Sequence, residues 1–372
     1  MRAGTSFTDS RAFSMAARLF VFKVLYLLLV CAAVLFLPHF FNMDNYYANL
    51  HGPGPDPRSF QSFFTTWDSQ NYILISEHGY RPGSILDAFY PLWPLCIRIF
   101  SYLTLGNSLA AGLILSNLLS VAALVVLHGY IAKRDGRTTA DYSILLILAF
   151  PGGFYLLLPY SESLFLLLTA FLLVYLARGD YVRAGLVTFL AVLARPVGIL
   201  LIVPLGLHIL AARRYRSLGC LLIPLSGYTL YFAVMYMTTG DALAGFHAQD
   251  LFPVHPSVRN IFDVTGFIDK MSETFPSIGQ IFFLWFIIAM AAVYKKDRDL
   301  FSLGLLMGLV PAMSNQLISF TRYALMVVPI FIVTASFFDR PGRKAWFFVF
   351  LAASFCLQIV LLFLHMNYYW VA

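Results

Sequence analysis

Long apolar runs separated by short basic clusters restrict the fold of this chain more than any other feature. Sixty per cent of the 372 residues are hydrophobic and only 12% are charged, whereas soluble domains carry roughly 25% charged residues. A water-soluble shell cannot be built from this composition, so we predict an all-α, polytopic transmembrane helical bundle. The apolar runs cover residues 19–38, 108–131, 141–159, 162–177, 184–212, 217–237, 278–294, 300–316, 319–337 and 345–366.

Lysine and arginine gather in five clusters between these runs, which is typical of cytoplasmic loops. Placing every cluster inside predicts about eleven membrane helical segments, a cytoplasmic N-terminus over residues 1–18 and an external C-terminus. Two large segments, 39–107 and 238–277, then become extracytoplasmic loops. No long polar linker divides the chain, so residues 1–372 are interpreted as one domain. The clusters are Lys133-Arg134 with Arg137, Arg178 with Arg183, Arg213-Arg214 with Arg216, Lys295-Lys296 with Arg298, and Arg340 with Arg343-Lys344.

This topology requires two departures from simple crossings. The run 88–105 must stay outside, and its prolines favour an interfacial helix over a spanning one. The run 184–212 must form a hairpin because both of its flanks are basic, with its break at Ala194-Arg195-Pro196-Val197-Gly198. Lys23 is expected to extend along the first helix toward the cytoplasmic surface.

Four charged residues are predicted near the outer side of the membrane, where a charge needs a specific reason. A carboxylate at Asp68, close to the apolar surface, would be partly desolvated and could act as a general base, or it could simply cap a helix. Glu162 could stabilise a helix N-terminus or contact a substrate hydroxyl or an arginine. Arg195 could pair with Glu162 or bind a lipid phosphate. Arg322 could extend to the interface or belong to the same site.

Other kinds of site have little support in the sequence. Asp241, His247 and Asp250 could resemble metal ligands, but their spacing fits no dedicated motif, so we expect neither a metal nor another cofactor. The net charge of +7 arises largely from the basic clusters between apolar runs. No basic stretch is interleaved with stacking aromatics, and we expect no nucleic-acid partner. The chain contains no Walker loop, GxGxxG, GxSxG or HExxH motif.

Several short motifs, in their order along the chain, resemble the PIG-V-type mannosyltransferases and their bacterial relatives in the GT-C glycosyltransferase superfamily. A Trp-x-Arg sequence that is typical of the family is absent after Gln249, where Asp250-Leu251-Phe252 stands. The motifs are Trp67-Asp68-Ser69-Gln70-Asn71-Tyr72, Gly79-Tyr80, Ala88-Phe89-Tyr90-Pro91-Leu92-Trp93-Pro94-Leu95, Pro159-Tyr160-Ser161-Glu162-Ser163, Ala194-Arg195-Pro196-Val197-Gly198, Gly240-Asp241 with His247-Ala248-Gln249, and Thr321-Arg322-Tyr323.

The resemblance implies a GT-C fold and an inverting transfer of a hexose from a polyprenyl-phosphate donor to an extracytoplasmic glycolipid, glycan or protein. It makes Asp68 the candidate general base, with Arg195 and Arg322 stabilising the lipid phosphate. The remaining candidates for substrate binding are Trp67, Tyr72, Glu162, His247 and Gln249.

The expected partners are the donor, the acceptor and membrane lipids. The expected location is a bacterial plasma membrane, or the endoplasmic reticulum if the chain is eukaryotic. The alternative function is a transporter or lipid flippase, which would show paired broken helices in two related halves. Only one clear break and no internal symmetry are visible in the sequence.

Overall fold

The structure, a computed structural model, describes residues 5–37, 40–49, 59–252, 258–273, 277–313 and 317–371. The regular elements in these ranges are α-helices and short 3-10 helices, and no strand is found among them. The predicted all-α class is therefore confirmed for the described part of the chain.

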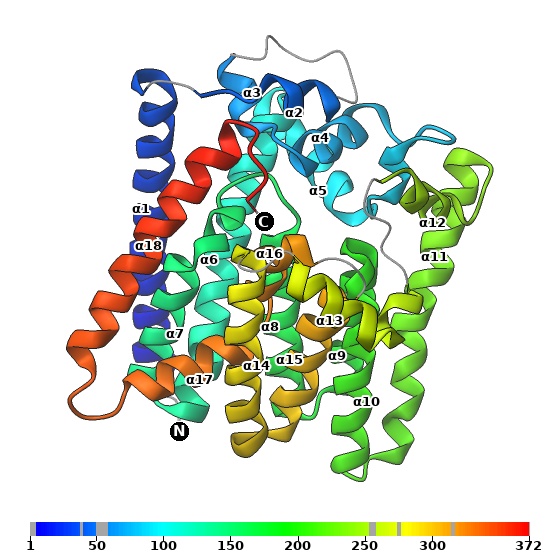
Figure 1. Ribbon diagram of the computed structural model, residues 1–372. Coiled ribbons are helices and arrows are strands. Elements are labelled where there is room, and N and C mark those ends of the chain that lie inside the picture. The colour runs from blue at the N-terminus through cyan, green and yellow to red at the C-terminus, as the bar shows by residue number, and fades with distance from the viewer. Residues whose placement is uncertain are drawn as a thin grey trace.

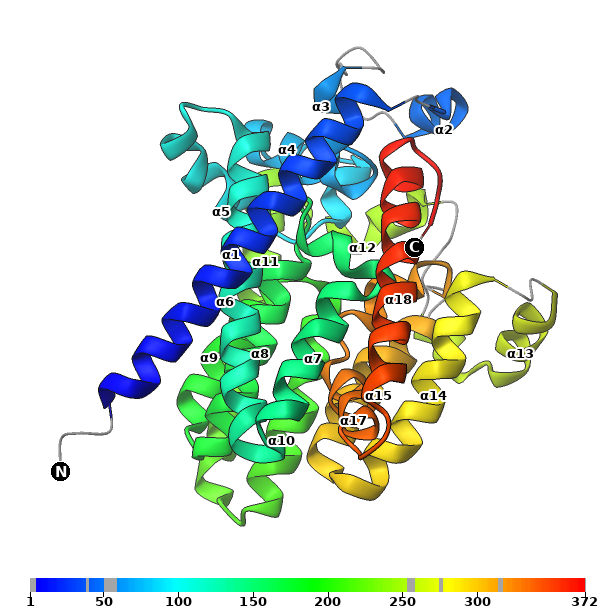
Figure 2. The same cartoon turned by 90° about the vertical axis from the view of Figure 1, so that its left-hand side faces the viewer.

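Most helices of the bundle run approximately along one common axis (Figures 1 and 2). Among the described residues, five helices or helical stretches are long and apolar enough to cross a membrane, namely Ala12–Phe36, Ser108–Asp135, Tyr215–Thr239, Ile278–Lys296 and Lys344–Met366. The chain is therefore an integral membrane protein, whereas eleven crossings remain a prediction. The bundle helices are α1 (Thr5–Phe36), α6 (Ser108–Asp135), α7 (Arg137–Ala149), α8 (Glu162–Arg178), α9 (Tyr181–Ala194), α10 (Ile202–Ala211), α11 (Leu222–Thr239), α14 (Ile278–Lys296), α15 (Arg298–Pro311), α17 (Val328–Phe338) and α18 (Lys344–Met366).

Short helices cover one end of the bundle, which we call the cap face (Figure 1). They come mostly from the predicted loop 39–107, and the loop 238–277 adds two more. The cap helices are α2 (Met43–Ala48), α3 (Phe60–Phe64), α4 (Asp68–His78), η1 (Ile85–Ala88), α5 (Leu92–Ser101), η2 (Tyr102–Thr104), α12 (Ala244–His247) and η6 (Ala248–Leu251).

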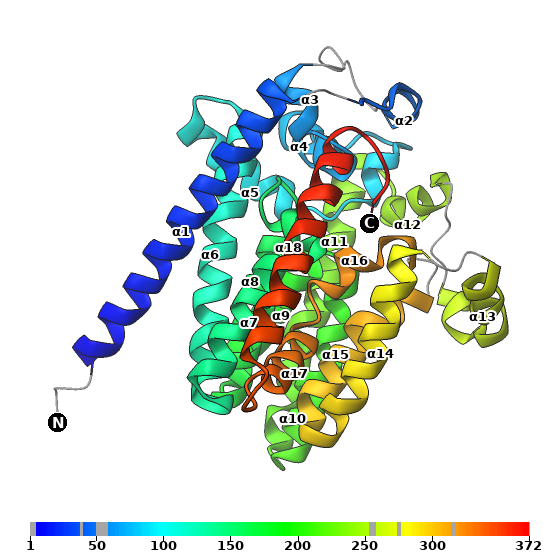
Figure 3. The same cartoon turned by 60° about the vertical axis from the view of Figure 1, so that its left-hand side comes forward.

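The remaining short helices connect the bundle helices or lie beside them. In Figure 3, α13 stands beside α14 and below the cap. These helices are η3 (Pro151–Leu156), η4 (Pro196–Leu201), η5 (Tyr215–Leu221), η7 (Val258–Phe262), α13 (Val264–Glu273), η9 (Leu317–Ser319) and α16 (Phe320–Ala324).

The opposite end, which we call the basic face, holds the junctions α6/α7, α8/α9, α10/α11, α14/α15 and α17/α18 (Figure 1). These are the five junctions that carry the basic clusters. Ion pairs cross between two of them, since Arg134 Nη2 lies 2.8 Å from Asp297 Oδ2 and Lys296 Nζ lies 2.7 Å from Asp135 Oδ1. The collection of all five clusters at one end is what the positive-inside pattern requires.

Helix α5 has the form expected of an interfacial helix. Its ten residues span about 15 Å, which is too short for a crossing of about 30 Å. Trp93 and Ile97 are fully buried against the bundle, whereas Leu95 and Ile99 on the other side are exposed.

The hairpin break predicted within 184–212 is also present. Helix α9 ends at Ala194, Arg195 is extended with φ −156°, and η4 begins at Pro196. Glycine is needed at position 198 because a Cβ there would lie 2.1 Å from the carbonyl oxygen of Ala191. The break therefore folds tightly back onto α9 and fixes where the Arg195 backbone leaves the helix.

The first helix differs from the prediction in two respects. It begins at Thr5, so much of the predicted N-terminal segment 1–18 is helical. The prediction that Lys23 extends to the cytoplasmic surface is wrong, because its side chain is buried and Nζ donates to the carbonyl oxygen of Leu156 at 2.9 Å. A carbonyl at helix η3 is available inside the bundle, so the ammonium pairs there.

Cysteines introduced on the two faces should be labelled by a maleimide from opposite sides of the membrane. In a background lacking Cys31, Cys96, Cys220 and Cys356, a Tyr102→Cys variant on the cap should react with an impermeant maleimide on intact cells. An Arg137→Cys variant should react only after permeabilisation. Both side chains are exposed, so access alone sets the difference, and equal labelling of the two variants in intact cells would contradict the topology.

Candidate active site

One arginine joins the two acids that the sequence singled out. Arg322 Nη1 donates to Asp68 Oδ2, and Arg322 Nε donates to Glu162 Oε1. Arg195 Nη1 donates to the same Glu162 oxygen at 2.6 Å. All four charged candidates therefore meet in one network, and of the two alternatives for Arg195 the pairing with Glu162 is the one that the structure shows.

The two acids occupy equivalent places in their helices. Asp68 is the first residue of α4 and Glu162 is the first residue of α8. A carboxylate at this position is stabilised by the helix dipole. The side chain of Asp68 does not act as the cap, because the N-cap of α4 is Trp67. Two helix N-termini thus converge on Arg322.

Three side chains of the network are largely buried, and the fourth is partly exposed. The side chain of Glu162 is 0% exposed, that of Arg195 is 7% exposed and that of Arg322 is 10% exposed. Two guanidiniums balance two carboxylates, as buried charges require. Asp68 is the most accessible member, with 26% of its side chain exposed.

The turn before Asp68 has an unusual backbone. Trp67 has φ 51° and ψ −125°, a conformation that costs a bulky residue about 1–3 kcal/mol. Two tyrosines from distant segments hold the turn, since Tyr160 OH donates to the Thr66 carbonyl at 2.9 Å and Tyr368 OH donates to the Thr65 carbonyl at 3.1 Å. The position of Asp68 is therefore determined by the surrounding fold.

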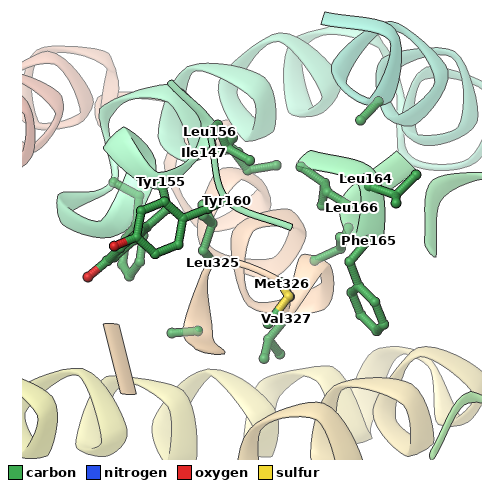
Figure 4. Close-up of a cluster of buried hydrophobic side chains, with 14 of the residues drawn as sticks. Ile147, Tyr155, Leu156, Tyr160, Leu164, Phe165, Leu166, Leu325, Met326 and Val327 are labelled. Carbon is green, nitrogen blue, oxygen red and sulfur yellow. The ribbon is translucent and has the colours of Figure 1, made fainter. Parts of the chain in front are cut away.

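Aromatic rings form the floor beneath the arginines. The Arg322 guanidinium lies 4.8 Å from the ring centre of Tyr160 and 5.4 Å from that of Tyr155, distances typical of cation–π contacts. Figure 4 shows these two tyrosines together at one end of a buried apolar cluster. Because Tyr160 OH donates to Thr66, it accepts from His365 Nε2, which lies at 3.1 Å.

A close backbone contact places Arg322 over this floor. A Cβ at Gly152 would lie 2.7 Å from the carbonyl oxygen of Thr321, so only glycine lets η3 and α16 approach so closely. Helix η3 also carries Tyr155, so this contact positions the arginine and its aromatic partner together.

The predicted residues Tyr72 and Trp67 lie beside the network. Tyr72 OH is 3.0 Å from Ser161 Oγ, which accepts a hydrogen bond from Arg195 Nη1, also at 3.0 Å. The ring of Trp67 packs edge-on against Trp370, with 4.7 Å between the ring centres. Both predicted residues are therefore positioned around the charged centre.

Sequence reasoning did not identify several residues that support the site. Tyr160 and Ser161 flank Glu162 in a motif already singled out, so their position next to an acid was an available signal. His365, Tyr368 and Trp370 come from the end of α18 and the segment after it, where most residues are apolar or aromatic.

His247 and Gln249 lie on the cap rather than in the network. His247 Nδ1 is 2.7 Å from Asp241 Oδ2, and the backbone N–H of Leu243 donates to Asp241 Oδ1 at 2.9 Å. These hydrogen bonds, with the backbone bond the larger cause, hold the pKa of the Asp241 carboxyl below its usual range. A substrate-binding role for His247 and Gln249 stays a prediction. Within the described ranges, no group of three His, Cys, Asp or Glu side chains could hold a metal ion.

Three buried polar atoms at the site lack hydrogen-bond partners among the described residues. They are Glu162 Oε2, Arg195 Nε and Trp67 Nε1. Native proteins satisfy most buried polar groups, so these three atoms are exceptions to the usual pattern.

Removal of the Glu162 charge should destabilise the protein strongly. A Glu162→Gln variant leaves two buried guanidiniums facing one carboxylate, which costs about 3–5 kcal/mol and should lower the thermal denaturation midpoint. A second change, Arg195→Gln, restores the charge balance and should recover part of the loss. Glu77→Gln, at an exposed position of α4, is the control. A midpoint for Glu162→Gln equal to that of this control would contradict the network.

Comparison with known sequences supports the motif-based resemblance. The sequence pattern of the mannosyltransferase (PIG-V) family matches residues 56–221. GPI alpha-1,6-mannosyltransferase 2 of Rattus norvegicus is 31% identical over 202 residues, covering 50% of this chain and 40% of the relative. The Cricetulus griseus protein of the same name is 32% identical over 144 residues, covering 36% of this chain and 29% of the relative. The matched regions therefore span well under half the length of these relatives.

A solved structure extends the comparison to the whole fold. The crystal structure of the Archaeoglobus fulgidus oligosaccharyltransferase, in complex with Zn and sulfate, aligns with a TM-score of 0.52 at 12% identity. The alignment covers 95% of this chain and 53% of that protein. At this identity the match shows the fold alone, which this chain shares with that protein over nearly its whole length. The resemblance of this chain to the PIG-V-type mannosyltransferases is thus confirmed over residues 56–221, a range that holds Asp68, Glu162 and Arg195.

Proposed function

We propose that the chain is an inverting glycosyltransferase that moves a hexose, mannose in our assignment, from a polyprenyl-phosphate donor to an extracytoplasmic glycolipid, glycan or protein. The observation that carries the proposal is the buried network of Asp68, Arg322, Glu162 and Arg195 beneath the cap. A mannosyl donor is favoured by the names of the similar proteins. The enzyme would act in a bacterial plasma membrane, or in the endoplasmic reticulum membrane if it is eukaryotic.

The two guanidiniums are suited to hold the phosphate of a lipid-linked donor. Arginine binds phosphate through paired N–H donors, and Arg195 Nε has no partner among the described residues. Glu162 contacts both arginines and so fixes the separation of the two cations. Because these groups are buried and already oriented, they can stabilise charge on the phosphate without reorganising during the reaction.

Asp68 is suited to accept the proton of the acceptor. In the proposed step, an acceptor hydroxyl oxygen attacks the anomeric carbon of the hexose, and its proton passes to the Asp68 carboxylate. The bond between the anomeric carbon and the phosphate oxygen breaks, and the polyprenyl phosphate leaves with the electron pair. Attack from the side opposite the leaving group inverts the anomeric configuration.

The ion pairs of Arg322 connect donor binding with the freeing of the base. Arg322 holds Asp68 and Glu162 at the same time. A donor phosphate that takes the Nη1 donor of Arg322 would displace Asp68, whose carboxylate then becomes available for the acceptor. The two arginines also offset the second negative charge that develops on the leaving phosphate.

Loss of the Asp68 carboxylate should remove activity and should destabilise the protein less than loss of Glu162, because the Asp68 side chain is 26% exposed whereas that of Glu162 is fully buried. An Asp68→Asn variant should lose at least about 100-fold in turnover of polyprenyl-phosphate mannose, because an amide cannot accept the proton. The control is Asp44→Asn, an exposed acid in the first turn of α2 on the same cap. Formation of a mannosylated product is measured by mass spectrometry. Wild-type turnover by Asp68→Asn would exclude it as the base, and substrate movement across proteoliposomes without any product would instead favour a transporter.

Replacement of either arginine by lysine should lower the activity. Arg322→Lys and Arg195→Lys keep one positive charge but lose the planar set of donors, so each should lower the turnover number by on the order of 100-fold. Arg81→Lys, an exposed position in the same outer segment, should retain wild-type activity. Unchanged turnover in both site variants would argue that the phosphate binds elsewhere.

A further inference from the structure

A large cavity lies in the bundle, and none of its lining residues belongs to the charged network. Its volume is about 1080 Å³ and it opens between α1, α6, α7 and α18. Cavities that hold drug-sized molecules measure about 300–1,000 Å³, so this cavity is large enough for a substantial ligand. We call it the α1 cleft.

Two hydrogen bonds hold α1 to the bundle above the cleft. Lys23 Nζ donates to the Leu156 carbonyl and Tyr26 OH donates to Gln358 Oε1, both at 2.9 Å. Toward the N-terminus, α1 diverges from α6 and α7 (Figures 2 and 3). The residues of α1 that line the cleft, from Ala12 to Phe22, all precede these two hydrogen bonds.

The walls of the cleft change character along its length. The side chains farthest from the basic face are apolar, and they include Phe22, Val125, Leu148 and Phe355. The end at the basic face carries Lys133 and Arg137 at the α6/α7 junction, and Arg18 lies on α1. Arg137 and Leu148 are eleven residues apart on one helix, which is roughly 16 Å. This distance separates a cationic mouth from an apolar interior.

The charge balance favours an anionic ligand. Arg18, Lys133 and Arg137 line the cleft, all three are exposed, and the structure shows no ion pair to any of them within its described residues. The one acid in the lining, Asp141, lies 2.8 Å from His128 Nε2 across the cleft. The mouth therefore keeps an excess of positive charge.

We propose that the α1 cleft binds an anionic phospholipid, with its phosphate headgroup at Lys133, Arg137 and Arg18 and its acyl chains against the apolar wall. Basic pockets between membrane helices on the cytoplasmic side bind such headgroups, and each nearby lysine or arginine makes the binding free energy more favourable. The site is separate from the proposed transfer reaction, which is assigned to the cap face, and its test needs no activity measurement.

The test is titration of the delipidated full-length protein in detergent, followed by native mass spectrometry. The probes are phosphatidylglycerol and phosphatidylcholine with identical acyl chains, and inorganic phosphate. Phosphatidylglycerol should bind on the order of tenfold more tightly than phosphatidylcholine. Equal binding of the two lipids would overturn the proposal. Displacement of bound phosphatidylglycerol by millimolar phosphate would also overturn it, because the acyl chains would then contribute nothing.

Two variants separate the cleft from general surface charge. The triple variant Arg18→Gln, Lys133→Gln, Arg137→Gln should lose the preference for phosphatidylglycerol. The control Arg178→Gln, Arg214→Gln, Arg216→Gln removes three exposed charges from other junctions of the same face and should keep it. An equal loss in the control would overturn the proposal.

A third variant tests the interior of the cleft. Gly129 lines the cleft, and a Cβ built there meets no atom within 4 Å, so Gly129→Phe fills the space without an initial clash and leaves every charge in place. It should weaken phosphatidylglycerol binding by about tenfold or more. Unchanged binding would show that the lipid associates with the surface rather than the cleft, and would overturn the proposal.

Discussion

The double ion pair of Arg322 organises the part of the molecule where chemistry is proposed. This side chain joins Asp68 on α4 to Glu162 on α8, two helices that belong to different parts of the chain. Removal of either acid leaves a buried cation that is not fully compensated, which is costly in a low-dielectric interior. The cap and the bundle are therefore connected by electrostatic pairing at the same place where the acceptor and donor would meet.

The environment of that pair explains why it can be both stable and reactive. Tyr155 and Tyr160 lie beneath the guanidinium, and Tyr160 also holds the strained turn that precedes Asp68. Interactions between charges are stronger where water is excluded, and a backbone strain persists only where the surroundings enforce it. Asp68 is held at the edge of this assembly, where it keeps access to the outside.

The sequence predicted those features that follow from composition and from isolated charges. Charged residues within apolar runs are rare, so Glu162 and Arg195 could be found, and the broken hairpin followed from Pro196 and Gly198. The sequence did not predict Lys23 correctly, because its burial depends on a carbonyl of η3, which is 133 residues away. His365 and Tyr368 were also missed, since a residue that supports a site only through tertiary contacts leaves no local signal.

Helix η3 connects the charged network with the α1 cleft. Its first turn touches Thr321 through Gly152, Tyr155 lies under Arg322, and its last residue, Leu156, accepts the hydrogen bond from Lys23 on α1. One of the two hydrogen bonds that hold α1 at the upper limit of the α1 cleft, that of Lys23, therefore ends on the element that forms the floor of the charged network. Close-packed interiors are nearly incompressible and transmit strain. The position of α1 and the geometry of Arg322 therefore both depend on the same short helix.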